Sequence, residues 1–348
     1  MAATASGRAR RRQRKAARLL AVAALATVTA ACAPSGDDSD AQGGEGGNTA
    51  AAAWPTSAVR IMAPADPGGG WDQTSRAVQE VLGGMVEPSV EVYNVGGAGG
   101  TVGIAQFVQN EGKTEELMMM GSIMVGAIET NKSPVTLDQV TPLARLIGET
   151  EVIVAPEASP YQSIEDLLEA MREDVGSVAI AGGSAGGIEQ VLAALIAQEL
   201  GAEPTDVNYI AHSGGGEALA TILSGRVQAG ISGLAEIQEQ IDAGQVKALA
   251  VSSAEPIEGI DAPTLKEAGV DIELTNWRGL VAPEGVEPDV EEAMEQQLQE
   301  MAESEEWKAV LEQRGWQDQF LAGEDFETFL DEEQERTRAV LEDLGLVG

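Results

Sequence analysis

The sequence repeats one pattern from Val59 onward: a short apolar or β-branched run, a turn, and then an amphipathic segment. Strands that alternate with helices in this way are typical of βαβ units, in which a mainly parallel sheet carries helices on both faces. The pattern therefore predicts an α/β fold. The part of the chain that follows residue 56 is long enough for two domains, each with its own apolar core.

The apolar runs predict nine strands and the amphipathic segments predict nine helices. The predicted strands are Val59–Ala63, Val90–Asn94, Glu116–Met120, Val152–Ala155, Val178–Ala181, Val207–Ile210, Val227–Ile231, Val246–Val251 and Trp277–Ala282. The predicted helices are Asp72–Leu82, Thr101–Gln109, Ile164–Arg172, Ile188–Leu200, Glu217–Leu223, Ile237–Asp242, Val290–Met301, Glu305–Arg314 and Phe326–Leu344.

Four of the strand-to-helix junctions carry a cluster of glycines: Pro67–Asp72, Gly96–Thr101, Gly182–Gly187 and Ser213–Glu217. The start of a helix leaves backbone N–H groups unpaired at the positive end of the helix dipole, which favours a carboxylate or a phosphate. In open α/β sheets such loops lie at the carboxyl ends of the strands, where ligands bind. We therefore expect the four loops to meet at one cleft, where two domains close on a multiply charged anion.

The N-terminus has the features of an export signal. Seven basic residues precede the apolar run Leu19–Val28, and three small residues then lead to Cys32. A transmembrane helix fits less well, because the run is shorter than the roughly 20 residues that span a bilayer. Cys32 resembles the lipidated cysteine of a bacterial lipoprotein, so we expect a signal peptide at residues 1–31 and a flexible tether at residues 32–56.

The composition is strongly acidic, with 57 Asp and Glu against 21 Lys and Arg and a net charge of −36. Nucleic acid is therefore excluded as a partner. The acids are spread along predicted helix faces and lack the spacing of a calcium loop, so we interpret them as a solvated surface. With one cysteine and one histidine in the chain, no internal disulfide can form, and we expect neither a metal cage nor a cofactor.

The nucleotide-binding motifs fail on spacing. A dinucleotide fingerprint would need a third glycine where the chain has Gln73 or Val102, and the phosphate-loop match at Gly112–Thr114 has Phe107 at its leading glycine.

A serine hydrolase is the alternative that the sequence leaves open. Gly182–Gly186 matches G-x-S-x-G between a predicted strand and a predicted helix, which would make Ser184 a nucleophile. The base would have to be His212, which follows 28 residues later and itself opens a glycine-rich loop. We interpret Ser184 instead as a hydroxyl donor on an anion-binding turn.

Several long stretches, in order, resemble the extracytoplasmic substrate-binding receptors of tripartite tricarboxylate transporters. They are Ala63–Thr74, Gly96–Gly103, Tyr209–Ala218, Ala262–Gly269 and Trp277–Pro283, within a similarity that runs from about Val59 to Gln317. The resemblance implies a two-domain clamp of the periplasmic-binding-protein type (type II), with the ligand cleft between the domains. It places domain one at 57–153 plus 276–348 and domain two at 154–275.

The resemblance also implies a function without catalysis. Such a receptor binds a small carboxylate and delivers it to a membrane permease made of one large and one small subunit. The Gly-Gly-Gly-Trp-Asp and His-Ser-Gly-Gly-Gly-Glu stretches are similar to the citrate-type branch, so we expect citrate or another tri- or dicarboxylate. We expect a monomer held on the outer face of the cytoplasmic membrane through Cys32. A ligand-binding sensor that uses the same clamp remains an alternative.

The ligand-binding residues follow from the family pattern and from the predicted strand ends. They are Gly68, Gly69, Gly70, Asp72 and Ser122 in the first domain, and Ser184, Gly186, Gly187, His212, Ser213, Ser232 and Glu236 in the second. An ionised Asp72 would repel a carboxylate, so we expect it to cap the helix or to hold water.

Overall fold

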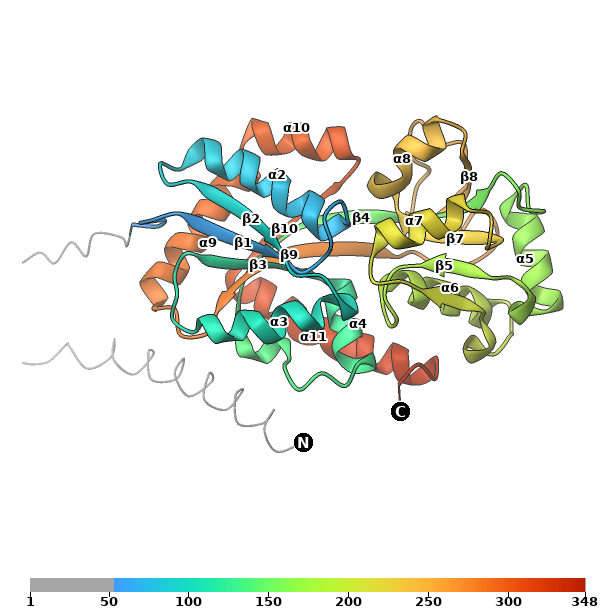
Figure 1. The fold of residues 1–348 in the computed structure, drawn as a ribbon, viewed down its shortest axis with the longest axis horizontal. Helices are drawn as coiled ribbons and strands as arrows, with labels where there is room; N and C mark the ends of the chain where they lie inside the picture. Colours follow the sequence, from blue (N-terminus) through green and yellow to red (C-terminus); the bar gives the residue numbers. More distant parts are fainter. Residues whose placement is uncertain (1–52, 348) are drawn as a thin grey trace, which may run out of the picture. The chain divides into compact units, whose positions relative to one another are not determined.

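A computed structural model of the chain describes residues 53–347 (Figure 1). The expected signal peptide, Cys32 and most of the expected tether lie outside these residues. The end of the tether range lies inside them: Trp54 is buried, and its Nε1 donates a hydrogen bond to the Thr114 carbonyl at 2.8 Å. None of the helices in the described part combines the length and the apolar character that crossing a membrane requires.

The strands form two sheets that share one long strand, β4 (Val140–Pro156). Sheet A holds the first half of β4 with β1 (Val59–Ala63), β2 (Val90–Asn94), β3 (Glu116–Gly121), β9 (Thr275–Pro283) and β10 (Gln317–Ala322). Sheet B holds the second half of β4 with β5 (Ile180–Gly182), β6 (Tyr209–Ala211), β7 (Ala229–Gly233) and β8 (Val246–Val251).

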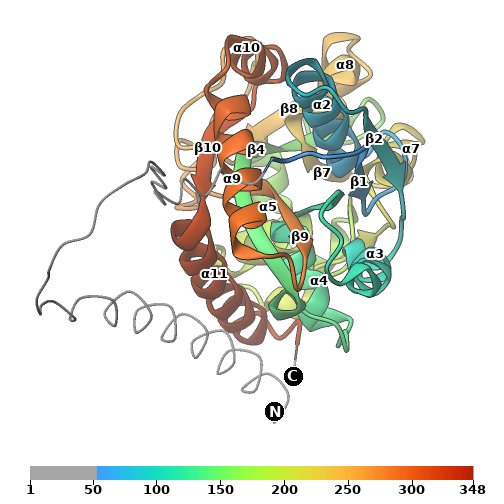
Figure 2. The ribbon, with the colours of Figure 1, turned by 90° about the vertical axis from the view of Figure 1, so that its left-hand side faces the viewer.

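Helices cover both faces of each sheet. Around sheet A lie α2 (Gly70–Met85), α3 (Thr101–Phe107), α4 (Ser122–Thr130), α9 (Pro288–Glu303), α10 (Glu305–Arg314) and α11 (Gly323–Asp343). Around sheet B lie α5 (Ile164–Glu173), α6 (Ile188–Glu199), α7 (Gly215–Leu223) and α8 (Leu234–Asp242). Figure 2 shows α10 beside α2 above sheet A, whereas α4 and α11 lie below it.

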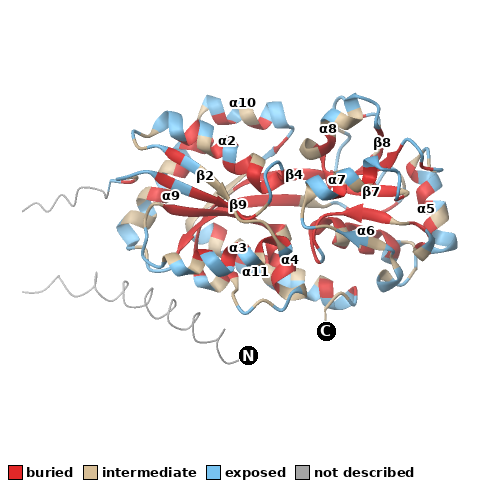
Figure 3. Ribbon diagram, viewed as in Figure 1, coloured by how far each residue is buried: buried red, intermediate tan, exposed pale blue. Residues whose placement is uncertain are grey.

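The apolar residues of the two sheets form separate cores, and the central strands are buried while the outer helix faces are exposed (Figure 3). The first core packs on sheet A and includes the fully buried Met118, Met119 and Met120, as the sequence predicts. Two further cores cover the two faces of sheet B. We call the elements on sheet A lobe one and those on sheet B lobe two. The exact residues at which one domain becomes the other remain a prediction.

Strands β4 and β9 connect the lobes. The register of this antiparallel pair runs from Val140 opposite Pro283 to Thr150 opposite Thr275, and β4 then continues into sheet B, where Glu151 lies opposite Gly233. The chain therefore enters lobe two along β4 and returns along β9, so these two strands must run in opposite directions.

The α/β fold is confirmed, and its sheets are mixed. Four of the nine strand pairings in the described part are parallel and five are antiparallel. The antiparallel pairings all involve β4 or β9, because these strands carry the chain in both directions between the lobes. The sequence prediction also missed α4, β10 and the first half of β4.

Candidate functional site

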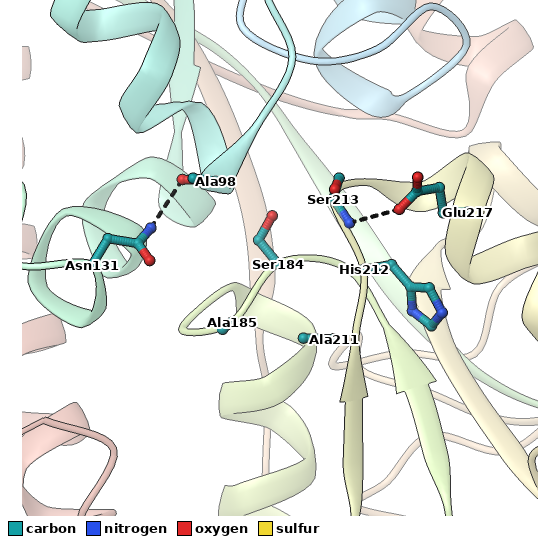
Figure 4. A pocket seen from close by; sticks show the side chains of 8 residues that line it. All are labelled: Ala98, Asn131, Ser184, Ala185, Ala211, His212, Ser213 and Glu217. Atoms are coloured by element: carbon teal, nitrogen blue, oxygen red, sulfur yellow. Dashed lines mark hydrogen bonds between the residues drawn. The ribbon is translucent and has the colours of Figure 1, made fainter.

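A cavity of about 260 Å³ lies where loops of the two lobes meet (Figure 4). Lobe one supplies Ala98 from the second glycine cluster and Asn131 from the end of α4. Lobe two supplies the remaining lining residues: Ser184 and Ala185 from the third cluster, and Ala211, His212, Ser213 and Glu217 from the end of β6 and the fourth cluster. We call these eight residues the mouth of the cleft.

The two lobes approach each other closely beside this cavity. Thr130 Oγ1, at the end of α4, donates a hydrogen bond to the Ala185 carbonyl at 3.2 Å. A Cβ atom at Gly126 would collide with the Gly186 carbonyl, so the glycine at this position permits the contact. The second and third clusters also touch, because a Cβ at Gly99 would lie 3.3 Å from that of Ser184.

At three of the four glycine clusters, a backbone N–H that precedes the helix is bonded to a side chain in the first turn. The N–H of Gly68 donates to Asp72 Oδ2 at 2.9 Å. In the same i to i+4 arrangement, the N–H of Gly186 donates to Gln190 Oε1 at 2.7 Å. The N–H of Ser213 donates to Glu217 Oε2 at 3.1 Å. These donors are therefore already satisfied inside the protein, and a ligand that used them would have to displace the capping oxygens.

Asp72 does not cap α2 itself, because the Gly68 N–H whose hydrogen bond it accepts precedes the N-cap residue of the helix, Gly69. Besides the Gly68 N–H, it accepts hydrogen bonds from Asn94 Nδ2 and Arg76 Nε, each at 2.9 Å. Burial alone would raise the pKa of this carboxyl, but the bonds from Arg76, Gly68 and Asn94 outweigh it, so the pKa lies below its ordinary value. Asp72 is therefore an ionised structural group at the start of α2.

His212 is held by two hydrogen bonds that leave neither ring nitrogen free. Its Nδ1 lies 3.0 Å from the Gly182 carbonyl, which can only accept, so Nδ1 carries the hydrogen. In the neutral ring Nε2 then accepts from Thr221 Oγ1 at 2.8 Å. The Ser184–His212 hydrogen bond that a serine hydrolase requires is absent from the described residues, and this removes the geometric basis for that alternative.

The Ser184 hydroxyl is the polar group of the mouth that is best placed for a ligand. The residue is 8% exposed, and its hydroxyl has no hydrogen-bond partner among the described residues. It lies between Ala98 and Ser213 in Figure 4, at the turn that precedes α6. A hydroxyl that faces a cavity and has no partner in the protein is free to bond to a bound molecule or to water.

Beneath the mouth, β4 and β9 carry a buried charged cluster. The Arg278 guanidinium is 1% exposed; its Nη2 forms an ion pair with Glu149 and lies 3.5 Å from Glu236 Oε1. Its Nη1 donates to Thr74 Oγ1 on α2 at 3.0 Å. Glu149 Oε1 also accepts the N–H of Ala235, at the start of α8, at 3.0 Å.

Two more glutamates complete this cluster. Glu151 follows Glu149 on the same face of β4, and its Oε1 accepts from Asn276 Nδ2 at 3.0 Å. The Asn276 Oδ1 in turn accepts from the Ser122 hydroxyl at 2.7 Å. Glu189, in the first turn of α6, is 6% exposed. We call Glu149, Glu151, Glu189, Glu236 and Arg278 the floor of the cleft.

Burial and mutual repulsion raise the pKa values of three floor carboxyls. Burial, with repulsion from Glu189, Glu149 and Glu236, raises the pKa of Glu151 well above its ordinary value. Burial is also the main cause of raising the pKa of Glu189 to about 7 and that of Glu236 to about 8, although Arg278 lowers both. One guanidinium does not compensate four carboxylates in a region shielded from water.

The expected ligand residues therefore divide between mouth, floor and surroundings. Ser184, His212 and Ser213 line the cavity, and Glu236 belongs to the floor. Ser122 lies in the polar chain next to the floor, and Ser232 is buried on β7 opposite Val152. The remaining expected residues, Gly68, Gly69, Gly70, Asp72, Gly186 and Gly187, belong to the capped helix starts and are not among the residues that line the cavity. Whether these residues touch a ligand stays a prediction.

The sequence analysis missed Glu149, Glu151, Glu189 and Arg278. A signal was present, because Glu149 and Glu151 interrupt an apolar run at alternate positions, and Arg278 lies in a predicted strand. Charges at core-facing positions of a strand are rare and mark a partnered cluster. No group of three or more side chains in residues 53–347 has an arrangement that could hold a metal ion.

Comparison with known proteins places the chain in a receptor family. Residues 74–346 match the model of the tripartite tricarboxylate transporter family receptor, TctC. The protein BugT of Bordetella pertussis is 26% identical over 265 residues, which cover 74% of this chain and 79% of BugT.

Two solved structures share the fold. Rpa4515 of R. palustris with adipate superposes with a TM-score of 0.76 at 19% identity, covering 85% of this chain and 99% of that one. MatC (Rpa3494) from Rhodopseudomonas palustris with bound malate superposes with a TM-score of 0.71 at 20% identity, covering 83% of this chain and 100% of that one. The expected fold of the periplasmic-binding-protein type is confirmed.

Proposed function

The chain belongs to the receptor family of tripartite tricarboxylate transporters, and we propose that it captures a small carboxylate outside the cytoplasmic membrane for delivery to a membrane permease. The cavity at the mouth is the binding site, and the two lobes close on the ligand about β4 and β9. The observation that carries this proposal is the hydroxyl of Ser184, which lines a cavity to which both lobes contribute and has no hydrogen-bond partner among the described residues.

The chemistry of the mouth is suited to a carboxylate held by neutral donors. None of the eight lining residues is a lysine or an arginine. The Ser184 hydroxyl offers a hydrogen bond, and the positive end of the α6 helix dipole adds a favourable field at contact distance. The acidic surface does not prevent such binding, because physiological salt screens charges beyond roughly 8 Å.

The ligand that we propose is a dicarboxylate or a tricarboxylate such as citrate. Two structures of the same fold hold adipate and malate, which are both dicarboxylates. A volume of about 260 Å³ is at the small end of ligand pockets, in agreement with a compact acid.

A screen of mono-, di- and tricarboxylates tests this proposal, with thermal unfolding followed by titration calorimetry. We expect at least one acid to raise the melting temperature by about 5 °C when present at a hundredfold excess over its dissociation constant. The diamide of the same acid is the matched control, because it keeps the shape and loses the charge. If no acid stabilises the protein, or if the diamide does so equally, the proposal is wrong.

Delivery and anchoring are tested separately in cells. We propose that Cys32 carries a lipid, so that Cys32→Ser should move the protein from the membrane fraction into the soluble exported fraction. Deleting the gene should abolish saturable uptake of the identified acid, and the wild-type gene should restore it. A receptor used only for sensing would bind the acid with unchanged affinity and leave uptake intact.

A further inference from the structure

The floor of the cleft contains more negative charge than its surroundings compensate. Arg278 is the cation that the described contacts place among Glu149, Glu151, Glu189 and Glu236. If all four carboxyls were ionised, the cluster would keep a net charge of three negative units in a region from which water is almost excluded. Such a charge is strongly unfavourable, and glutamate avoids it by binding a proton.

Two carboxylate oxygens in this cluster have the environment of a protonation site. Oε2 of Glu151 and Oε2 of Glu189 are buried and have no hydrogen-bond partner in the described part of the chain. Glu151 is 0% exposed and Glu189 is 6% exposed. An ionised oxygen in such a place lacks a donor, whereas a protonated carboxyl becomes a donor itself and can bond to a neighbouring carboxylate.

Both lobes contribute side chains to this cluster. Arg278 comes from β9 in lobe one, whereas Glu236 and Glu189 come from α8 and α6 in lobe two. Glu236 contacts glycine clusters of both lobes. Its carboxylate accepts the N–H of Gly70 in lobe one, and it lies so close to Gly215 in lobe two that a Cβ at that position would collide with it. Separation of the lobes would therefore open this cluster to water.

The floor is also adjacent to the mouth. Glu189 accepts the N–H of Gly183, the residue directly before Ser184. Gly215, which contacts Glu236, is two residues before Glu217 in the lining of the cavity. A negative ligand at Ser184 would therefore add to the negative potential that the floor carboxyls already experience.

We propose that Glu151, Glu189 and Glu236 form a proton-binding site at the floor of the cleft, so that capture of a carboxylate is accompanied by the uptake of protons. This inference rests on the proposed function. The protons compensate the charge of the bound anion, in a mouth whose lining has no lysine or arginine.

The direction of the coupling follows from hydration. With the lobes apart, water solvates the three carboxyls and their pKa values return toward 4.5, the ordinary value for glutamate. With the lobes together, burial raises the pKa of Glu189 to about 7 and that of Glu236 to about 8. The other titratable groups that face these carboxyls are Glu149, Arg278 and Tyr209, and the pKa of Tyr209 is itself raised by burial and by Glu189 and Glu151. Closure at neutral pH therefore takes up protons, and binding weakens as the pH rises through 7 and 8.

Calorimetry in buffers of different ionisation enthalpy measures these protons directly. The probes are malate and adipate, titrated into the wild-type protein at pH 6.5, 7.5 and 9. We expect about two protons taken up per ligand at pH 6.5, about one at pH 7.5 and fewer at pH 9, with the dissociation constant rising about tenfold per pH unit for each proton taken up.

Isosteric variants locate the site. Glu189→Gln and Glu236→Gln should each reduce the number of protons taken up and flatten the pH dependence of affinity. The matched controls are Glu199→Gln on α6 and Glu239→Gln on α8, which replace exposed residues of the same helices and should leave the uptake unchanged. Infrared difference spectra of the wild-type protein give a second measurement, in which ligand addition should increase the signal of protonated carboxyl groups.

The outcomes separate the two proposals. Binding of malate or adipate without proton uptake at any of the three pH values, or equal uptake in the Glu189 and Glu236 variants, would overturn the proton site and leave the receptor function intact. If no carboxylate in the screen binds at any pH, the proposed function itself is wrong.

Discussion

The mouth and the floor of the cleft differ in how fully their polar groups are hydrogen-bonded. At the mouth, His212 and Glu217 lie near solvent and are satisfied by local hydrogen bonds within the glycine clusters. At the floor, four glutamates surround one arginine, and two of their oxygens have no partner in the described part of the chain. The bonds that satisfy His212 and Glu217 lie within lobe two, whereas the floor joins strands and helices from both lobes.

The difference has an energetic consequence. Charges near water interact weakly, because solvent screens them whether or not they are paired. A carboxylate at the floor must be paired with a cation or take up a proton. The desolvation cost of an isolated ion is several kcal/mol even after relaxation, which is similar to the total free energy of unfolding of a typical protein. Substitutions at the floor should therefore change folding and pH dependence, and those at the mouth should change affinity.

The largest effect is expected for Arg278→Met, because it leaves Glu149 buried without its cation. We expect the free energy of unfolding to fall by about 3 to 5 kcal/mol. The measurement is chemical denaturation at pH 7. Arg76→Met is the matched control, since Arg76 pairs with Asp72 but is 50% exposed, and its loss should be below about 1 kcal/mol. Equal losses in the two variants would break the distinction between floor and surface.

The second effect is the pH dependence of stability. The pKa values of Glu189 and Glu236 are raised in the folded state, so their contribution is most favourable below pH 4.5 and is lost as the pH rises through about 7 and 8. Since each proton contributes about 1.4 kcal/mol per pH unit, the free energy of unfolding should fall by about 3 to 4 kcal/mol between pH 6 and 8.

Denaturation curves at several pH values and at high salt measure this fall, because salt screens the general repulsion of the acidic surface. The double variant Glu189→Gln with Glu236→Gln should be less sensitive to pH than the wild type. An unchanged slope in that variant would assign the pH dependence to other groups.

A smaller effect is expected for Ser184→Ala at the mouth. Loss of one hydrogen bond to a charged ligand should weaken carboxylate binding by about tenfold to a hundredfold. The free energy of unfolding should change by less than about 0.5 kcal/mol, because the hydroxyl has no partner in the described residues. Unchanged affinity in calorimetry would place the ligand elsewhere.

The smallest effect is expected for Glu217→Gln. Glutamine keeps the oxygen that accepts the Ser213 N–H and removes one negative charge from the cavity lining. A dicarboxylate should bind about two- to fivefold more tightly at low salt, and the gain should vanish at high salt. A gain that persisted at high salt would indicate a change in contacts instead of charge.

Much of the fold was predictable from local patterns. Strands β1, β2 and β8 have the predicted bounds, because a compact apolar run there coincides with a strand between two turns. The first half of β4 was missed, since Pro142, Arg145 and Glu149 interrupt its apolar character. It becomes a strand because β9 pairs with it on one side and β10 on the other. A pairing between such distant segments leaves no periodic signal in the sequence.

The candidate site was also predictable only in part. The sequence identified Ser184, His212 and Ser213, because glycine clusters at strand ends mark the loops of a ligand cleft. It missed the capping of those loops by Gln190 and Glu217, since a side chain four residues ahead can equally well point into solvent.

By itself, the sequence determined the alternation of strands and helices, the positions of the four glycine clusters and the resemblance to a receptor family. These features depend on residues that are close along the chain, where apolar periodicity and turn chemistry act directly. Only the tertiary structure decided that the sheets are mixed and share β4, and that Arg278 lies among four glutamates from both lobes. The reason is physical: the ionisation of a carboxyl depends on the water and charges around it, and here those are set by segments that lie far away in the sequence.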